Sequence, residues 1–332
     1  MATRFAVLGS GAWGTCVAMI LAQNPQHQVA LWSARPDQAD WHLRRENVRL
    51  LPGIVIPPTI LLTTDIRQAV REVDLLIAAI PTVYLRPTLE RIAAEIPANR
   101  PVLSLAKGLE NHTFRRPTEI VLEVLGPRSV AVLSGPSHAE EVARGLPTTL
   151  AVASEDLSLA QQIQQCFSTE RFRVYTNLDL VGVELAGALK NVIGIAAGIN
   201  DGLGFGDNSK SALLTRGLSE MARFGVALGA DAQTFWGLAG MGDLITTCIS
   251  RHGRNRAVGE RLAKGEKLAD IQASTAMVAE GVFTARSVYE KSQQMGIPMP
   301  ICTEVYNVLY ERKNPREAVN DLMRRELRSE HW

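Results

Sequence analysis

The sequence has few of the features that mark several specialised classes of protein. Its 332 residues include four cysteines, far apart and without a CxxC pair, so we expect reduced thiols and no metal or disulfide framework. A formal net charge of +1 argues against a nucleic-acid or membrane-surface protein. The longest apolar runs, Leu75–Ile80 and Val192–Ile199, are too short to span a bilayer. No stretch near residue 1 resembles a signal peptide, so we expect a cytoplasmic protein.

The beginning of the sequence contains a glycine-rich turn between an apolar run and a helical pattern. Phe5–Leu8 has strand character, and Gly9, Gly11 and Gly14 follow at the spacing G-x-G-x-x-G, after which apolar residues recur at helical spacing. In this context the glycines permit a tight turn and close approach of a pyrophosphate, while the helix start offers free N–H groups. The pattern predicts a dinucleotide site. The alternative is a glycine-rich turn that binds no ligand.

The remainder of the chain has two parts with different hydrophobic patterns. Up to Thr176, short apolar runs alternate with helical patterns, which predicts an α/β Rossmann domain with a mostly parallel sheet over residues 1–178. After that only helical periodicity remains, so we expect an all-helical domain over residues 179–332. No flexible linker marks the boundary, and the domains should pack tightly. The expected strands are Phe5–Leu8, Gln28–Trp32, Leu75–Ala79, Val102–Leu105, Val130–Leu133, Thr149–Ala153 and Phe172–Tyr175.

Polar residues that follow the strands are the first candidates for ligand contacts, because ligands of open sheets bind beyond the carboxyl ends of strands. Arg35 stands near the place where an acidic residue usually selects NAD, so it suits the 2′-phosphate of NADP, unless it is simply solvated. Lys107 either points towards a ligand at the carboxyl ends of the strands or lies on the surface of a turn. Ser137 and Glu140 fit a capping box, yet Gly135 and Ser137 could also present donors to a ligand.

The helical half contributes a second group of candidates. Lys190 lies in an otherwise apolar helix, where burial is costly or lowers the pKa, so it is either an acid–base group or a lysine whose amine reaches water. Asp243 lies near the start of another helix. Arg254, Asn255 and Arg256 then form either a phosphate clamp or a solvated face.

Taken together, these segments resemble one family over essentially the whole chain: the bacterial NAD(P)-dependent glycerol-3-phosphate dehydrogenases. The resemblance implies reversible reduction of dihydroxyacetone phosphate to sn-glycerol 3-phosphate, supplying glycerophospholipid synthesis, with NADPH/NADP as cofactor and NADH/NAD also accepted. The matching motifs are GSGAWGT (9–15), LPG (51–53), AKGLE (106–110), SGPSHAEE (134–141), FRVYTN (172–177), GALKNV (187–192), DGLGFGDN (201–208), GMGD (240–243), RNR (254–256) and EG (280–281).

The resemblance also implies roles for individual residues, with Lys190 as the catalytic proton donor and acceptor. The cofactor-binding residues, motif glycines included, are Gly9, Gly11, Ala12, Trp13, Gly14, Arg35, Lys107, Ala139, Arg254, Val278 and Glu280. The substrate-binding residues are Lys107, Gly135, Ser137, Lys190, Asp243, Gly253, Arg254 and Asn255. The sequence departs from the family at Gly253 and Ala12, each of which replaces a common serine. At Gly253 a backbone N–H contact could remain.

Two other functions fit parts of the sequence. One is a different two-domain dehydrogenase with a catalytic lysine, acting on a hydroxy acid or sugar acid whose carboxylate would bind Arg254. The other is a sensor of NAD(H), which would need an output domain that the sequence does not show. The long apolar helices of the second half lead us to expect a homodimer that binds a small-molecule substrate and neither nucleic acid nor membrane.

Overall fold

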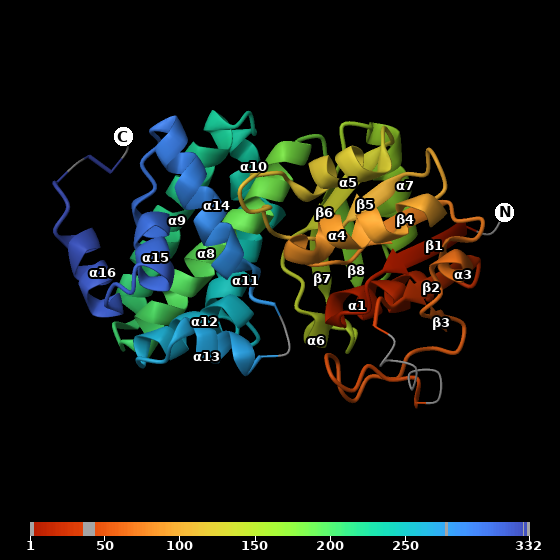
Figure 1. Ribbon diagram of the computed structural model, residues 1–332, viewed down its shortest axis with the longest axis horizontal. Helices are drawn as coiled ribbons and strands as arrows, with labels where there is room; N and C mark the ends of the chain where they lie inside the picture. Colours follow the sequence, from red (N-terminus) through yellow and green to blue (C-terminus); the bar gives the residue numbers. More distant parts are fainter. Residues whose placement is uncertain (1–2, 36–43, 276–277, 328, 331–332) are drawn as a thin grey trace.

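The computed structural model describes residues 3–35, 44–275, 278–327 and 329–330 and consists of a sheet domain beside a helical domain (Figure 1). The described strands form one sheet in the order β3-β2-β1-β4-β5-β6-β7-β8. Their bounds are β1 Thr3–Leu8, β2 His27–Trp32, β3 Leu61–Thr63, β4 Leu75–Ala78, β5 Val102–Ser104, β6 Val130–Ser134, β7 Thr148–Ala153 and β8 Phe172–Asn177.

The prediction of a mostly parallel sheet is confirmed. The first six strands in sheet order, β3, β2, β1, β4, β5 and β6, are mutually parallel. Strand β7 pairs antiparallel with β6, and β8 runs parallel to β7. Each of the seven expected strands is present, with ends that differ by no more than two residues. The edge strand β3 was not expected, because three residues with an exposed Leu61 are too short to show a periodic pattern.

Helices cover both faces of the sheet, as the continuous apolar strands predicted. Alternate residues of β1 point to opposite faces: Phe5 and Val7 join one apolar cluster, and Ala6 and Leu8 join the other. Helices α1 (Ala12–Leu21), α6 (Ala139–Val142) and α7 (Leu157–Phe167) cover the first face. Helices α3 (Ile66–Val70), α4 (Thr82–Ile92), which runs on into the 3₁₀ turn η2 (Ala93–Glu95), and α5 (Pro117–Leu125) cover the second.

The helical domain is built around α8 (Leu180–Gly202), whose Asp179 cap accepts a hydrogen bond from the Gly182 N–H at 2.8 Å. By length and composition α8 alone among the described helices could cross a membrane, but 89% of its apolar window is buried in the protein, as in a core helix. The apolar surface of α8 is therefore buried within its own chain, and the expected homodimer stays a prediction.

The other elements of the helical domain follow α8 in the chain. They are α9 (Gly206–Ala227), α10 (Ala232–Trp236), the π-helical turn η3 (Leu238–Gly242), α11 (Asp243–Ile249), α12 (Arg254–Ala263), α13 (Leu268–Ala273), α14 (Glu280–Met295), α15 (Pro300–Tyr310) and α16 (Pro315–Met323).

Glycines let α8 approach its neighbours at backbone distance. A Cβ added to Gly198 would lie 1.9 Å from the carbonyl oxygen of Arg256 in α12, and one added to Gly259 would lie 2.0 Å from that of Ile195. Nearer its start, α8 passes the end of β6, where a Cβ on Gly187 would lie 2.9 Å from the Ser134 hydroxyl oxygen. The small residues of α8 thus bring its polar side chains close to both domains.

A buried carboxylate, that of Glu184, joins the two domains. Glu184 of α8, whose side chain is fully buried, accepts hydrogen bonds from the N–H and hydroxyl of Thr118 at 2.8 and 2.7 Å and from the Arg116 guanidinium at 2.7 Å. Burial raises the pKa of Glu184, and Arg116 opposes that shift. Because these partners precede or begin α5, the carboxylate ties the helical domain to the sheet domain.

Removal of this carboxylate should destabilise the protein strongly. We expect Glu184→Ala to lower the free energy of unfolding by about 3–5 kcal/mol, because it leaves the Arg116 charge and the start of α5 without their buried partner. Urea unfolding followed by circular dichroism measures the change. The matched control is Glu95→Ala, which removes a carboxylate that pairs with the exposed Arg67 and should leave the unfolding midpoint almost unchanged. Equal unfolding midpoints for the two variants would contradict a stabilising role of Glu184 between the domains.

Candidate active site between the domains

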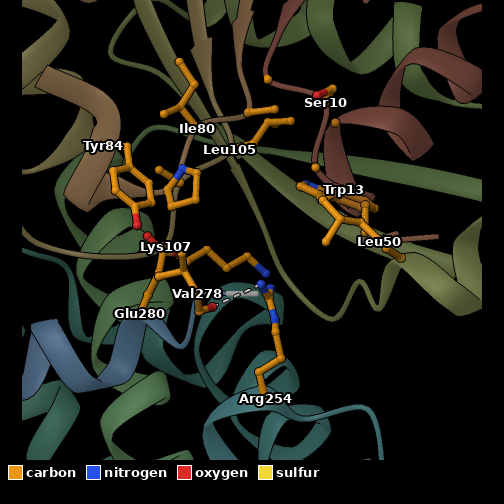
Figure 2. A pocket seen from close by; sticks show the side chains of 18 of the residues that line it. Ser10, Trp13, Leu50, Ile80, Tyr84, Leu105, Lys107, Arg254, Val278 and Glu280 are labelled. Carbon is orange, nitrogen blue, oxygen red and sulfur yellow. Dashed lines mark hydrogen bonds between the residues drawn. The ribbon is translucent and has the colours of Figure 1, made fainter. Parts of the chain in front are cut away.

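A cavity of about 610 Å³ lies where the carboxyl ends of the parallel strands face the helical domain. Figure 2 shows Lys107 of the sheet domain and Arg254 of the helical domain extending into it, with Trp13 and Leu50 on one wall. Every predicted site residue except Gly135 lines this cavity: Gly9, Gly11, Ala12, Trp13, Gly14, Arg35, Lys107, Ser137, Ala139, Lys190, Asp243, Gly253, Arg254, Asn255, Val278 and Glu280.

The glycine turn has the geometry that a pyrophosphate needs. Gly9 has a φ of +115°, and a Cβ there would lie 2.5 Å from the carbonyl oxygen of Ala79. A Cβ on Gly14 would lie 2.0 Å from the carbonyl oxygen of Gly9, so α1 packs against the turn itself. Around Gly11, in contrast, the space within 4 Å of a Cβ is open, and α1 begins there without a side-chain cap. The free N–H groups of α1 and this open space fit a dinucleotide phosphate.

Two serines that the sequence analysis did not single out lie beside this turn. The hydroxyl oxygens of Ser10 and Ser33 are 3.0 Å apart, and the backbone N–H of Arg35 donates to the Ser33 hydroxyl at 3.2 Å. Arg35 itself is exposed at the rim of the cavity, after β2. The guanidinium is therefore accessible to a phosphate, and the local turn is fixed by serine hydroxyl groups.

The centre of the cavity contains one carboxylate between two ammonium groups. Asp243, at the start of α11, accepts from Lys107 Nζ at 2.7 Å through one oxygen and lies 3.2 Å from Lys190 Nζ through the other. Lys190 also donates to the hydroxyl of Thr247 at 2.6 Å. The side chains of Asp243 and Lys190 are only 3% and 9% exposed. Lys190 is thus held inside the site. The alternative that its amine reaches bulk water is wrong.

Burial and charge set the protonation of this group. Burial lowers the pKa of Lys190 to about 8, Asp243 opposes the shift, and the nearby Lys107 ammonium adds to it. Burial alone would raise the pKa of Asp243, but Lys107 and Lys190 outweigh burial and hold it below its usual range. The prediction that desolvation moves the pKa of Lys190 towards neutrality is confirmed. The site therefore combines a fixed anion with an amine that can gain or lose a proton near physiological pH.

A chain of side-chain amides connects the elements around the lysines. Asn191 donates to the carbonyl oxygen of Lys107 at 2.8 Å and accepts from the Asn255 amide at 2.8 Å. The oxygen of Asn255 in turn accepts from the N–H of Gly281 at 3.0 Å. The loop after β5 is thus joined to α8, α12 and α14. The Asn255 amide donates to α8 and accepts from α14. It therefore holds these two helices together, and it also lines the cavity.

The start of α14 also contacts the sheet domain. Glu280 accepts a hydrogen bond from the backbone N–H of Thr82, at the start of α4, at 2.8 Å. The carbonyl oxygen of Val278 accepts from the Arg254 guanidinium at 3.2 Å, as the dashed line in Figure 2 shows. These contacts place Glu280, Val278 and Arg254 on one edge of the cavity.

Two interpretations of the sequence were wrong. Arg256 does not belong to a phosphate clamp, because its guanidinium pairs with Asp201 and Glu260 at 2.6 Å each and Arg256 does not line the cavity. Ser137 is not the cap of a capping box, because α6 begins one residue later with His138 as its cap. Residues two apart in a helix point in directions about 200° apart, so Arg254 faces the cavity when Arg256 does not.

Gly135 lies behind the cavity and contributes through its backbone. Its carbonyl oxygen accepts from Lys107 Nζ at 2.8 Å and from the hydroxyl of Ser137 at 2.9 Å. Its φ is +134°, and a Cβ there would lie 2.8 Å from the Leu150 side chain, so the position favours glycine. At Gly253 the expected free N–H is absent, since it donates to the carbonyl oxygen of Ser250 at 3.1 Å.

The sequence analysis missed the second partner of Lys190, although a signal existed. Thr247 lies four residues after Asp243 on the same helix, a spacing that places both side chains on one face. Asn191 directly follows Lys190 and was likewise not given a role. Thr247 would have been found by asking which polar residues share a helical face with Asp243. Asn191 had no such signal, because consecutive helical residues point in different directions.

Comparison with known proteins gives one consistent result over nearly the whole chain. Two family models, the N- and C-terminal parts of NAD-dependent glycerol-3-phosphate dehydrogenase, match residues 4–160 and 179–320. The chain belongs to this family. Two curated glycerol-3-phosphate dehydrogenases [NAD(P)+] are each 48% identical: that of Chlorobium limicola, with 98% of this chain and 99% of the relative covered, and that of Geobacillus thermodenitrificans, with 98% and 95% covered.

Solved structures show the same relationship. The glycerol-3-phosphate dehydrogenase of Coxiella burnetii superimposes with a TM-score of 0.93 at 36% identity, covering 97% of this chain and 99% of that one. A D-mandelate dehydrogenase complex with NADH aligns with a TM-score of 0.60 at 14% identity, over 93% of this chain and 98% of that one, which shows the shared fold alone. The Rossmann-like sheet followed by a helical domain is thus the fold of the glycerol-3-phosphate dehydrogenase family.

Proposed function

We propose that this protein catalyses the reversible reduction of dihydroxyacetone phosphate to sn-glycerol 3-phosphate with NADPH or NADH, and that Lys190 is its proton donor and acceptor. The observation that carries the proposal is the buried Lys190 ammonium, 3.2 Å from Asp243, in the same cavity as the glycine turn of a dinucleotide fold. The relatives at 48% identity, which carry the name glycerol-3-phosphate dehydrogenase [NAD(P)+], support the choice of substrate.

The residues that would hold the cofactor come mainly from the sheet domain. The open space at Gly11 and the start of α1 suit the pyrophosphate, and the exposed Arg35 suits a 2′-phosphate. Further contacts would come from Ala12, Trp13, Lys107, Ala139, Arg254, Val278 and Glu280 along the cavity. When bound, the nicotinamide supplies the hydride.

Lys190 performs the proton transfer. Reduction of a ketone generates an alkoxide, and an ammonium group beside it stabilises that charge and then donates a proton. With a pKa of about 8, Lys190 is mostly protonated at pH 7 and yet able to release its proton. Asp243 and Thr247 fix the position of its Nζ atom, while Asp243 also holds Lys107 on the other side. In the reverse reaction the neutral amine accepts the proton of the alcohol.

The substrate phosphate would bind at the start of α12. Arg254 is the first residue of that helix, is exposed to the cavity, and follows Gly253, a cap without a side chain. A guanidinium and the positive end of a ten-residue helix together suit a phosphate dianion. Lys107, Ser137, Asp243 and Asn255 would complete the contacts to the rest of the substrate, with Gly135 orienting Lys107.

The proposal divides the work between residues 1–178, which would bind the cofactor, and residues 179–332, which would provide Lys190 and the phosphate site. The end of β8 at Asn177 and the start of α8 at Leu180 support that boundary. We further propose a cytoplasmic homodimer whose product supplies glycerophospholipid synthesis.

The direct test is the loss of nicotinamide absorbance when the purified protein is mixed with dihydroxyacetone phosphate and NADPH or NADH. We expect turnover with dihydroxyacetone phosphate and little or none with a panel of 2-keto and 3-keto acids. Turnover of the keto acids alone would point to the hydroxy-acid alternative. Cofactor binding without any turnover would point to a sensor.

Replacement of Lys190 should remove the acid and leave the cofactor site intact. We expect Lys190→Ala to lower kcat by about a hundredfold or more, because general acid catalysis contributes on the order of 10²–10⁴. The dissociation constant of NADPH should stay nearly unchanged. Lys190→Arg should not restore activity, since a guanidinium releases its proton too reluctantly. The control is Lys210→Ala, whose lysine pairs with Asp201 outside the cavity and whose loss should leave kcat near normal. Near-normal kcat in Lys190→Ala would transfer the role to Lys107.

The pH dependence provides a second readout of the same group. Reduction requires the ammonium form of Lys190, so kcat/KM for dihydroxyacetone phosphate should fall as the pH rises through about 8. Oxidation of glycerol 3-phosphate requires the neutral amine and should rise through the same range. Asp243→Asn removes the charge that raises the pKa of Lys190, so the residual activity of that variant should show both limbs at lower pH.

Arg35 should set the preference between the two cofactors. We expect Arg35→Asp to raise the KM for NADPH by about tenfold or more and to spare the KM for NADH, because a charge-assisted contact is worth roughly 1.5–3 kcal/mol. Steady-state kinetics with each cofactor measures the effect. Arg71→Asp makes the same charge change at an exposed position of the sheet domain outside the cavity and should alter neither KM. An equal rise for both cofactors would refute this role for Arg35.

A further inference from the structure

Two histidines from different domains face each other in the wall of the cavity, and the proposed mechanism uses neither. His138 precedes α6 of the sheet domain, and His252 lies in the loop between α11 and α12 of the helical domain. Their ring centroids are 5.8 Å apart with an interplanar angle of 53°. Both residues line the cavity together with Lys107, Lys190 and Arg254.

His138 contains an unsatisfied polar atom. Its Nε2 is buried and has no hydrogen-bond partner among the described residues. Leaving such an atom unpaired costs free energy, so a ligand that supplies a partner gains affinity there. Burial and the charge of Lys190 lower the pKa of His138, with Lys107 adding to the shift and Asp243 and Glu140 opposing it. These effects favour the neutral ring, which has one N–H to donate.

The position of His252 shows which part of a ligand lies nearby. His252 comes immediately before Gly253, the cap of α12, and two residues before Arg254. The start of α12 is where a phosphate is favoured by the helix dipole and by the guanidinium. Because the ring of His138 packs against that of His252, the His138 ring lies beside the loop that leads into α12.

We propose that His138 contacts the substrate and donates a hydrogen bond from Nε2 to the phosphate of dihydroxyacetone phosphate, with His252 as a positioning residue across the cleft. This inference rests on the proposed function. Nε2 is shielded from solvent, so the contact requires a neighbouring side chain to turn aside.

Three variants of His138 separate the hydrogen bond from packing. His138→Phe keeps an aromatic ring against His252 but has no donor, His138→Gln keeps an N–H at a similar reach, and His138→Ala removes both. We expect the Phe and Ala variants to raise the KM for dihydroxyacetone phosphate by about tenfold with kcat changed much less. His138→Gln should recover most of the loss. The dissociation constant of NADPH, measured by fluorescence, should stay constant and report a folded cofactor site.

Dihydroxyacetone, which lacks the phosphate, is the matched control substrate. Its kcat/KM should be the same in the wild type and in His138→Phe, since the proposed contact is absent in both cases. His252→Ala should raise the KM for dihydroxyacetone phosphate less than His138→Ala does. An equal loss on both substrates would place His138 at the carbonyl end and overturn the phosphate contact, as would an unchanged KM in His138→Phe.

The wild-type protein distinguishes this inference from the function on which it rests. Without wild-type turnover of dihydroxyacetone phosphate, the proposed function fails and the role of His138 fails with it. With normal wild-type turnover and an unchanged KM in His138→Phe, only the role of His138 fails.

Discussion

The site depends on one buried carboxylate that satisfies two ammonium groups from different domains. Without Asp243, Lys190 would be a buried charge beside the like charge of Lys107, and it would be driven towards its neutral form. The carboxylate keeps Lys190 charged at pH 7, and burial keeps its pKa within reach of proton transfer. The same pairing joins the loop after β5 to α11, so the electrostatic requirement of the proposed proton transfer and the contact between the domains are one interaction.

Much of this arrangement was predictable from the sequence, because its strongest signals are local. The glycine turn, the alternation of strands and helices, and a lysine in an apolar helix each depend on residues close together in the chain. Those signals predicted the fold and the lowered pKa of Lys190, which the structure confirms. The resemblance to the family extended them to residues far apart, such as Ala139 and Glu280, that line one cavity. Their functional roles stay predictions.

The remaining features depend on side-chain direction and tertiary partners, which the sequence does not contain. In the sequence, Arg256 is as good a candidate for a phosphate ligand as Arg254. In the structure it is paired with Asp201, near the end of α8. Ser137 fitted a capping pattern, but its hydroxyl donates to the carbonyl oxygen of Gly135 and the helix begins one residue later. Thr247 and His252 gain their significance only because α11 and the loop that follows it face the sheet domain. Long-range packing decided each of these cases.

The close passage of α8 past β6 at Gly187 has a consequence for the room around the charged groups. Gly187 lies one helical turn before Lys190, and a Cβ there would be 2.9 Å from the Ser134 hydroxyl and 3.6 Å from the Lys107 side chain. Even the smallest side chain would have to displace the Ser134 hydroxyl and would lie in van der Waals contact with the stem of Lys107. A glycine that performs no chemistry thus leaves room for the Ser134 hydroxyl and the Lys107 side chain one turn away from Lys190.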